Sequence, residues 1–371
     1  MSAAFEIQLI AALVAVACAL PGVFLVLRRM AMVSDAITHT VLLGIVTGFF
    51  LTRNLESPIL LVCASLTGVF TVWLTELVYK SKLISEDASI CIIFPLLFSI
   101  AIILITRYAG NVHLDTDSVL LGELAFAPFD RLYVMGRDIG AKGIYISFAL
   151  VAINLVFILL FYKELQLATF DANLAAALGF VPGIIHYLLM GLVSLTTVGA
   201  FEAVGSILVV AFMIGPPVTA YLMTDNLKKM IVLSAVIGLF NAISGYHLAT
   251  WKDVSIAGSM AVMTGFTFLI VFLFVPRRGL ISVLIRRYRQ RYIFAEKTLM
   301  FHLWHHEGTP KEEEEALYKT IRLHMHWDKK FAERVVKKLL SDGRVILEGN
   351  LLKLSEKGRQ ESRRDRRELL G

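Results

Sequence analysis

The sequence predicts an all-α protein that crosses a membrane about nine times and continues into a small polar tail. Of its 371 residues, 57% are hydrophobic and only 18% are charged, whereas ordinary soluble domains carry about 25% charged residues. Apolar runs of about 20 residues recur, and each is long enough to cross the roughly 30 Å hydrocarbon core as a helix. Residues 277–371 hold 23 Lys+Arg and 14 Asp+Glu, a net charge of +9, while the remainder has a net charge of −3. The chain therefore combines a membrane body with a basic tail.

The apolar runs and the basic residues between them predict the topology. Spans are expected at residues 7–27, 31–51, 57–79, 89–106, 143–162, 184–201, 204–223, 230–248 and 255–275. Basic residues cluster at alternate ends of these spans, as at Arg28, Lys80 and Lys228. Because such ends usually lie in the cytoplasm, we expect the N-terminus outside and the tail inside. The first run is a span and no signal peptide, because many spans follow it and it lacks a basic start.

Two segments between spans have residue patterns that predict more structure than a simple loop. Residues 108–142 form a long external insertion that mixes acids with apolar residues. Residues 164–183 form a cytoplasmic segment in which Asp171 can cap a short helix, and Gly179 with Pro182 ends it. A short amphipathic helix at this face could receive a motor protein, or it could lie on the bilayer surface.

Ionisable residues within spans are costly and therefore indicate function. Asp35 and His39 are four residues apart, so a helix places them on one face. Carboxylate and imidazole donors suit Mn²⁺, Fe²⁺ or Zn²⁺. The alternative is an ion pair that stabilises helix packing, and the spacing alone leaves both interpretations open. With no thiolate nearby, a cysteine-based structural zinc site is excluded.

The other ionisable residues in the spans are single. Glu76 lies one turn from Lys80 near a span end, and we interpret it as a solvated structural residue. His186 and His247 lie near span ends and are interpreted as ordinary polar groups. Glu202, beside glycines and threonines, is a tentative further residue of a metal pathway.

Four stretches in consistent order resemble the membrane permease subunit of the manganese, zinc and iron family of ABC importers. They are RRMAMVSDAITHTVLLGI at 28–45, LISEDASICIIF at 83–94, YKELQLATFDANLAAALGF at 162–180 and GAFEAVGSILVVAFMIGPPVTAYLMTDNL at 199–227. The resemblance covers about residues 5–280 and implies a type II permease of the kind shared with vitamin B12 importers, in the bacterial inner membrane. It implies that Asp35 and His39 coordinate a transported Mn²⁺, Zn²⁺ or Fe²⁺ ion, with no permanently bound cofactor.

The same resemblance implies a set of partners. Two cytoplasmic ATPases would drive transport, an external metal-binding protein would deliver the ion, and a second permease, identical or a sister subunit, would complete the pathway. The family's ATPase-coupling segment corresponds here to Phe170, Asp171, Ala175 and Gly179. The chain itself contains no GxxxxGK[ST] phosphate-binding loop and no catalytic constellation, so an enzyme activity of its own is not expected.

The sequence of the tail predicts a small α+β domain. We divide the chain into a permease domain at 1–280, a linker helix at 281–294 whose arginines suit anionic lipid headgroups, and a cytoplasmic domain at 295–371. Three helices, the second over EEEEALYKTIRLH and the third capped by Asp328, precede a hairpin that turns at Gly349–Asn350. This order is winged-helix organisation, and LLKLSEKGR resembles the wing of metal-dependent repressors of the diphtheria-toxin-repressor type.

Several functions are open for this tail. Its third helix carries possible DNA-phosphate contacts at Lys329, Lys330, Arg334 and Lys337. The alternatives are a contact with the ATPases or the permease dimer and, for the whole chain, a membrane-tethered metal-responsive regulator. His302 and His306 lie four residues apart, so they are either a regulatory metal site or ordinary helix-surface histidines.

Overall fold

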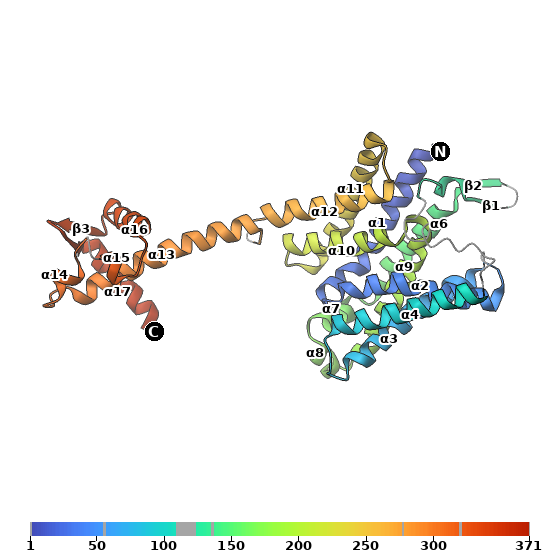
Figure 1. Ribbon diagram of the computed structural model, residues 1–371, viewed down its shortest axis with the longest axis horizontal. Helices are drawn as coiled ribbons and strands as arrows, with labels where there is room; N and C mark the ends of the chain where they lie inside the picture. Colours follow the sequence, from blue (N-terminus) through green and yellow to red (C-terminus); the bar gives the residue numbers. More distant parts are fainter. Residues whose placement is uncertain are drawn as a thin grey trace. The chain divides into compact units, whose positions relative to one another are not determined.

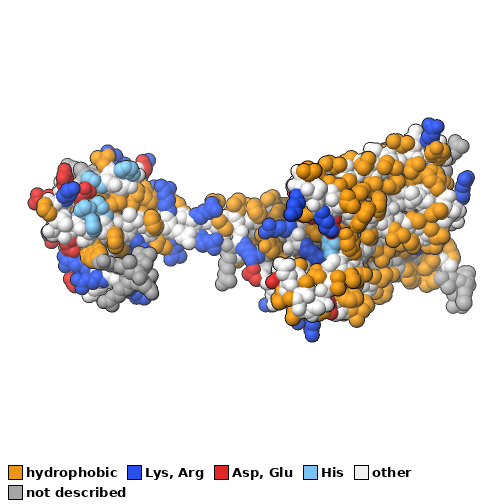
Figure 2. Space-filling view, turned by 90° about the horizontal axis from the view of Figure 1, so that it is seen from below, with side chains coloured by type: hydrophobic (Ala, Val, Ile, Leu, Met, Phe, Trp, Pro, Cys, Tyr) orange, Lys and Arg blue, Asp and Glu red, His pale blue; other side chains and the backbone are white. Residues whose placement is uncertain are grey.

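The computed structural model describes residues 2–54, 57–108, 124–134, 137–276, 278–318 and 321–370, without the side chains of Val134, Arg137, Glu202 and residues 365–370. The chain divides into two compact units (Figure 1), Met1–Gly279 and Leu280–Gly371, here called the membrane unit and the tail unit. Apolar side chains cover most of the face of the membrane unit that Figure 2 shows, as expected of a surface in contact with lipid.

Within the described ranges, nine helices are long and apolar enough to cross a membrane. They match the predicted spans to within four residues at each end, and a helix of 22 residues is about 33 Å long. These helices are α1 (Ala3–Leu27), α2 (Ala31–Thr52), α3 (Pro58–Tyr79), α4 (Glu86–Tyr108), α6 (Lys142–Leu160), α9 (Pro182–Val204), α10 (Ser206–Met223), α11 (Leu227–Lys252) and α12 (Ile256–Phe274).

Helix α1 lies at the centre of the membrane unit, against α6, α9, α10 and α11. Its contact with α10 is backbone to backbone, since a Cβ at Gly22 would lie 2.0 Å from the carbonyl oxygen of Met213. Helix α10 contains Pro216 and Pro217. A proline has no N–H to donate to the residue four positions earlier, so Pro217 leaves the Met213 carbonyl without its helical partner. That carbonyl packs on Gly22 instead.

Helices α2, α3 and α4 lie side by side in a second group (Figure 1). Small and hydroxyl side chains join α2 to α3, where Thr71 Oγ1 donates to Thr40 Oγ1 at 2.9 Å. A buried amide joins α6 to α1 and α9, because Asn154 Nδ2 donates to the Ala17 carbonyl at 2.9 Å and Asn154 Oδ1 accepts from Thr196 at 3.0 Å. Such bonds satisfy polar groups that lipid cannot solvate.

Two connections between spans carry their own structure. The segment predicted to be cytoplasmic, at 164–183, contains α7 (Tyr162–Phe170) and α8 (Ala172–Ala177). The described end of the predicted external insertion forms a 3-10 turn, η1 (Ala127–Phe129), and an antiparallel hairpin of β1 (Arg131–Val134) and β2 (Arg137–Ala141). This hairpin was not predicted from the sequence; residues 109–123 of the insertion lie outside the described residues.

The tail unit contains five helices and one hairpin within its described residues. They are α13 (Leu280–His306), α14 (Glu312–Glu315), α15 (Ile321–His324), α16 (Lys329–Ser341), β3 (Val345–Glu348), β4 (Leu351–Leu354) and α17 (Glu356–Leu370). Its core is formed by one face of α16 against α13 and the hairpin, with Val335, Leu339 and Leu299 fully buried. Asp328 caps α16 by accepting from the Lys330 N–H at 3.2 Å, as predicted.

The helices of the tail correct three expectations. The predicted linker helix at 281–294 and the first helix of the tail are one continuous helix, α13, because no helix-ending residue stands between them. The predicted second helix is two short ones, α14 and α15. Between them Ala316 and Tyr318 bond to the hairpin, with the Leu352 N–H donating to the Ala316 carbonyl at 2.9 Å. The charged end forms α17, which was not predicted.

Candidate functional site

The predicted Asp35/His39 pair lies in the second and third turns of α2. The two side chains share one face of the helix, with His39 Nε2 3.7 Å from Asp35 Oδ1. The pair is not enclosed, since the exposed fraction is 40% for the Asp35 side chain and 31% for His39. Both groups therefore remain accessible to an ion or to another chain.

The imidazole of His39 is held by aromatic rings from α4. It stacks on Phe94 with ring centroids 5.4 Å apart and meets the edge of Phe98 at 6.1 Å. Ring contacts of this kind restrict the rotation of the imidazole without occupying its nitrogens. No further His, Cys, Asp or Glu among the described residues joins the pair in a group of three. The pair offers one oxygen and one nitrogen, which is an incomplete coordination shell for Mn²⁺, Fe²⁺ or Zn²⁺.

The other tentative residue of a metal pathway, Glu202, lies near the end of α9. Its side chain is outside the described part of the structure, so its participation stays a prediction.

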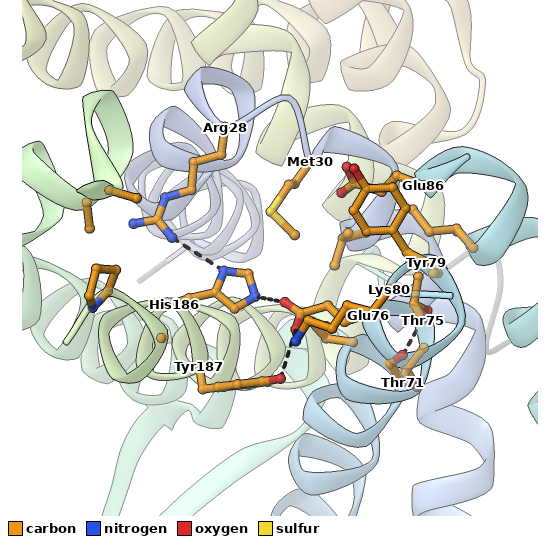
Figure 3. Close-up of a pocket in the computed structure, with 18 residues that line it drawn as sticks. Arg28, Met30, Thr71, Thr75, Glu76, Tyr79, Lys80, Glu86, His186 and Tyr187 are labelled. Carbon is orange, nitrogen blue, oxygen red and sulfur yellow. Dashed lines mark hydrogen bonds and ion pairs between the residues drawn. The ribbon is translucent and has the colours of Figure 1, made fainter. Parts of the chain in front are cut away.

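A second polar site surrounds a cavity of about 430 Å³ between the ends of α1, α3 and α9. Figure 3 shows the Glu76 carboxylate beside His186 and Tyr187. His186 Nε2 lies 2.6 Å from Glu76 Oε1, while Tyr187 Oη and Lys80 Nζ donate to Glu76 Oε2 at 2.9 and 3.1 Å. The Glu76 and His186 side chains are only 21% and 16% exposed. Glu76 is therefore bonded to other side chains of the protein rather than solvated, which corrects the interpretation from the sequence.

Arg28 joins this cavity to the segment between α6 and α9. Its Nη1 lies 3.4 Å from His186 Nδ1, and its Nε donates to Thr169 Oγ1 of α7 at 3.1 Å. Burial lowers the pKa of Arg28 to about 10, so the guanidinium stays charged at neutral pH. No sequence signal predicts this network, because Glu76 and His186 are far apart in the chain and only the packing of α3 on α9 brings them together.

The predicted coupling residues lie on α7, on α8 and in the turns that follow these helices. Asp171 caps α8 by accepting from the Leu174 N–H at 2.9 Å, and Ala175 is fully buried. Phe170 is 63% exposed, and Gly179 has a φ of +89°, a conformation that favours glycine. The large apolar side chains exposed on this segment and the first turn of α9 are Phe170, Leu174, Leu178, Phe180, Val181 and Ile184. The segment therefore presents an apolar surface around a capped helix.

The predicted tail residues fall into two groups. Lys329, Lys330 and Lys337 are exposed on α16, whereas Arg334 donates to Tyr288 Oη of α13 at 3.0 Å. His302 and His306 lie on adjacent turns of α13, with ring centroids 4.7 Å apart.

These features define a polytopic helical membrane protein with a polar pair inside its second span and an exposed apolar segment between two later spans, which is the organisation of a transport subunit. The family model described as the ABC 3 transport family matches residues 2–275, and the chain belongs to this family of membrane permeases.

Relatives extend the comparison to most of the chain. The manganese transport system membrane protein MntD of Bacillus subtilis is 47% identical over 284 residues, 76% of this chain and 96% of MntD. The zinc transport system membrane protein TroD of Treponema pallidum is 43% identical over 353 residues, 95% of this chain and 96% of TroD. The solved structure of PsaBC from Streptococcus pneumoniae in complex with Fab has a TM-score of 0.63 at 28% identity, over 75% of this chain and 94% of that one.

Proposed function

We propose that this chain is the permease of an ATP-driven importer of divalent transition metal ions, and that Asp35 and His39 contact the ion on its path. The observation that carries the proposal is the accessible pair of one carboxylate and one imidazole in α2, held in place by Phe94. Ionisable residues within a predicted span are costly and therefore indicate function.

The cargo class follows from the donors and from the relatives. MntD is named for manganese and TroD for zinc, and both ions accept mixed oxygen and nitrogen ligands. One carboxylate and one imidazole admit Mn²⁺, Zn²⁺ and Fe²⁺, so the proposal extends to all three.

A second permease would supply the ligands that the pair lacks. Asp35 and His39 provide two donors per chain, and a partner with an equivalent pair would bring the number to about four, the usual count for zinc. We propose that the pairs of two permeases meet across their interface. An external binding protein would deliver the ion at the opposite end of the pathway from the tail.

Uptake measurements on single variants test the pathway. We expect Asp35→Asn and His39→Ala to lower the uptake of Mn²⁺ and Zn²⁺ at least about tenfold, because even second-shell changes at metal sites cost 10–100-fold. Matched controls are Asp253→Asn and His247→Ala, at exposed positions of α11 and its end. Full uptake by both pathway variants, at equal expression, would refute the assignment.

The partner ATPases are proposed to dock on α7 and α8. An exposed phenylalanine at the centre of an interface typically contributes more than about 1 kcal/mol to binding. Phe170→Ala is therefore expected to weaken the ATPase–permease complex about tenfold and to lower coupled ATP hydrolysis. Phe148→Ala on α6 is the control, since both phenylalanines are 63% exposed. Equal complex stability in the two variants would contradict this docking surface.

For the tail, we propose a winged-helix-like module that contacts the ATPases or the permease dimer. The bonds of Ala316 and Tyr318 to the hairpin support this fold, because they add a third short strand segment beside β4. Arg334 is engaged by Tyr288, which leaves fewer cations for phosphate contact. Salt-sensitive binding of promoter DNA by the full-length protein would favour a DNA role or the regulator hypothesis instead.

A further inference from the structure

Four side chains of the types that ligate metals gather in the tail unit from three elements. His302 and His306 lie on α13, Glu315 ends α14, and His324 ends α15. Ligand atoms of His302, His306 and Glu315 all lie within 4.8 Å of one another. No other group of three among the described residues is placed in this way.

The glutamate lies at the centre of the group. Glu315 Oε2 is 2.9 Å from His324 Nδ1 and 3.6 Å from His302 Nε2. The rings of His302 and His306 are 4.7 Å apart between centroids, and His302 and His324 are 6.4 Å apart. Ligands at about 2.0–2.2 Å from a tetrahedral ion lie roughly 3.4 Å from each other, so small side-chain rotations bring these atoms to bonding positions.

Imidazole and carboxylate groups donate lone pairs to a metal in their unprotonated forms, so the affinity of such a site depends on pH. The histidine and glutamate side chains are partly exposed, which leaves a route for an ion from solvent.

We propose that the tail unit binds one divalent transition metal ion through His302, His306 and Glu315, with His324 as a fourth ligand. A set of two or three imidazoles and one carboxylate selects Zn²⁺, Fe²⁺ or Co²⁺ over Mg²⁺ and Ca²⁺, which prefer all-oxygen ligands. Because the ligands come from separate helices, the ion would fix α14 and α15 on α13. The proposal is independent of the proposed transport function, since the site lies within the tail unit and its test measures no transport.

The competing interpretation is a hydrogen-bonded cluster without metal. His302 Nε2 also lies 3.2 Å from the Glu315 carbonyl oxygen, and this contact alone could hold α14 on α13. The two interpretations differ in metal binding and in what metal does to the amides of α14 and α15.

The experiment uses the full-length chain in lipid nanodiscs, with Asp35→Asn and His39→Ala introduced to remove the α2 pair. Co²⁺ is the probe, since its visible ligand-field bands report histidine and carboxylate ligation, and Zn²⁺ is the competitor. We expect one Co²⁺ per chain, displaced by Zn²⁺, with affinity at least about tenfold lower in His302→Gln and in Glu315→Gln. His305→Gln is the matched control, because His305 is an exposed neighbour on α13 outside the group.

Hydrogen exchange separates metal ligation from misfolding of a variant. On the chain with His302, His306 and Glu315 intact, Zn²⁺ should slow amide exchange in α14 and α15 and leave α16 unchanged. Absence of Co²⁺ binding, binding that is equal in His302→Gln and His305→Gln, or exchange that does not respond to Zn²⁺ would each overturn the proposal.

Discussion

The membrane unit contains two carboxylate–imidazole pairs with opposite surroundings. Asp35 and His39 are 3.7 Å apart, partly exposed, and contacted by rings rather than by further charges. Glu76 and His186 are 2.6 Å apart and mostly buried, and Tyr187, Lys80 and Arg28 bond to them. The carboxylate and imidazole of the first pair still have lone pairs available for an ion, whereas those of the second pair already bond to neighbouring side chains. Residue types alone do not distinguish a ligand site from a structural one; the number of bonds already made does.

The most direct test of this difference removes the charge of the carboxylate in each pair and measures the free energy of unfolding. Glu76→Gln should lower the free energy of unfolding by about 2 kcal/mol, because three contacts lose their charge assistance in a mostly buried site. Asp35→Asn should change it by less than about 0.5 kcal/mol, as usual for exposed sites. Thermal unfolding of the purified protein in detergent measures both. Equal destabilisation would remove the distinction between the pairs.

A smaller effect is expected from the rings that hold His39. Phe94→Leu keeps an apolar side chain but removes the stacking contact at 5.4 Å, worth about 1 kcal/mol. The metal concentration for half-maximal uptake should therefore rise about fivefold. Phe268→Leu, which removes a stacked pair within α12, is the control. An unchanged half-maximal concentration for Phe94→Leu would show that the rings do not orient the ligand.

The smallest effect concerns the third carboxylate–imidazole group, in the tail unit. Burial holds the pKa of folded His302 below its ordinary value, so the unfolded chain takes up the proton first as the pH falls. In metal-free buffer the tail should keep its stability above about pH 6.5 and lose part of it below. Amide exchange in α13, followed against pH, measures this. The loss should be smaller in His302→Gln, and an identical pH profile would contradict the assigned cause.

The sequence could predict the spans and the Asp35/His39 pair because both are local signals. A 20-residue apolar window is visible without knowing any neighbour, and a spacing of four residues places two side chains on one face. The cap residues Asp171 and Asp328 were likewise correctly predicted, since a cap bonds within three residues.

Features that depend on packing between distant segments were missed. Glu76 was interpreted as solvated because its only sequence neighbour of opposite charge is Lys80, and nothing local indicates that α9 brings His186 and Tyr187 to it. Glu315 and His324 escaped notice as partners of His302 for the same reason, since α14 and α15 had been expected to form one helix. The hairpin β1–β2 was missed because each strand is only four or five residues long.

The contact between Gly22 and α10 makes the substitutions tolerated at residue 22 depend on the residue at position 217. A methyl group at residue 22 would meet the Met213 carbonyl and also lie 3.1 Å from Pro217 Cγ. Both obstacles stem from Pro217, which leaves that carbonyl unpaired and places its ring beside α1. A chain that first replaced Pro217 by alanine could draw the carbonyl back into its own helix and then accept alanine at 22. In the reverse order, the intermediate would carry the clash, so only one mutational route between the two sequences passes through a well-packed protein.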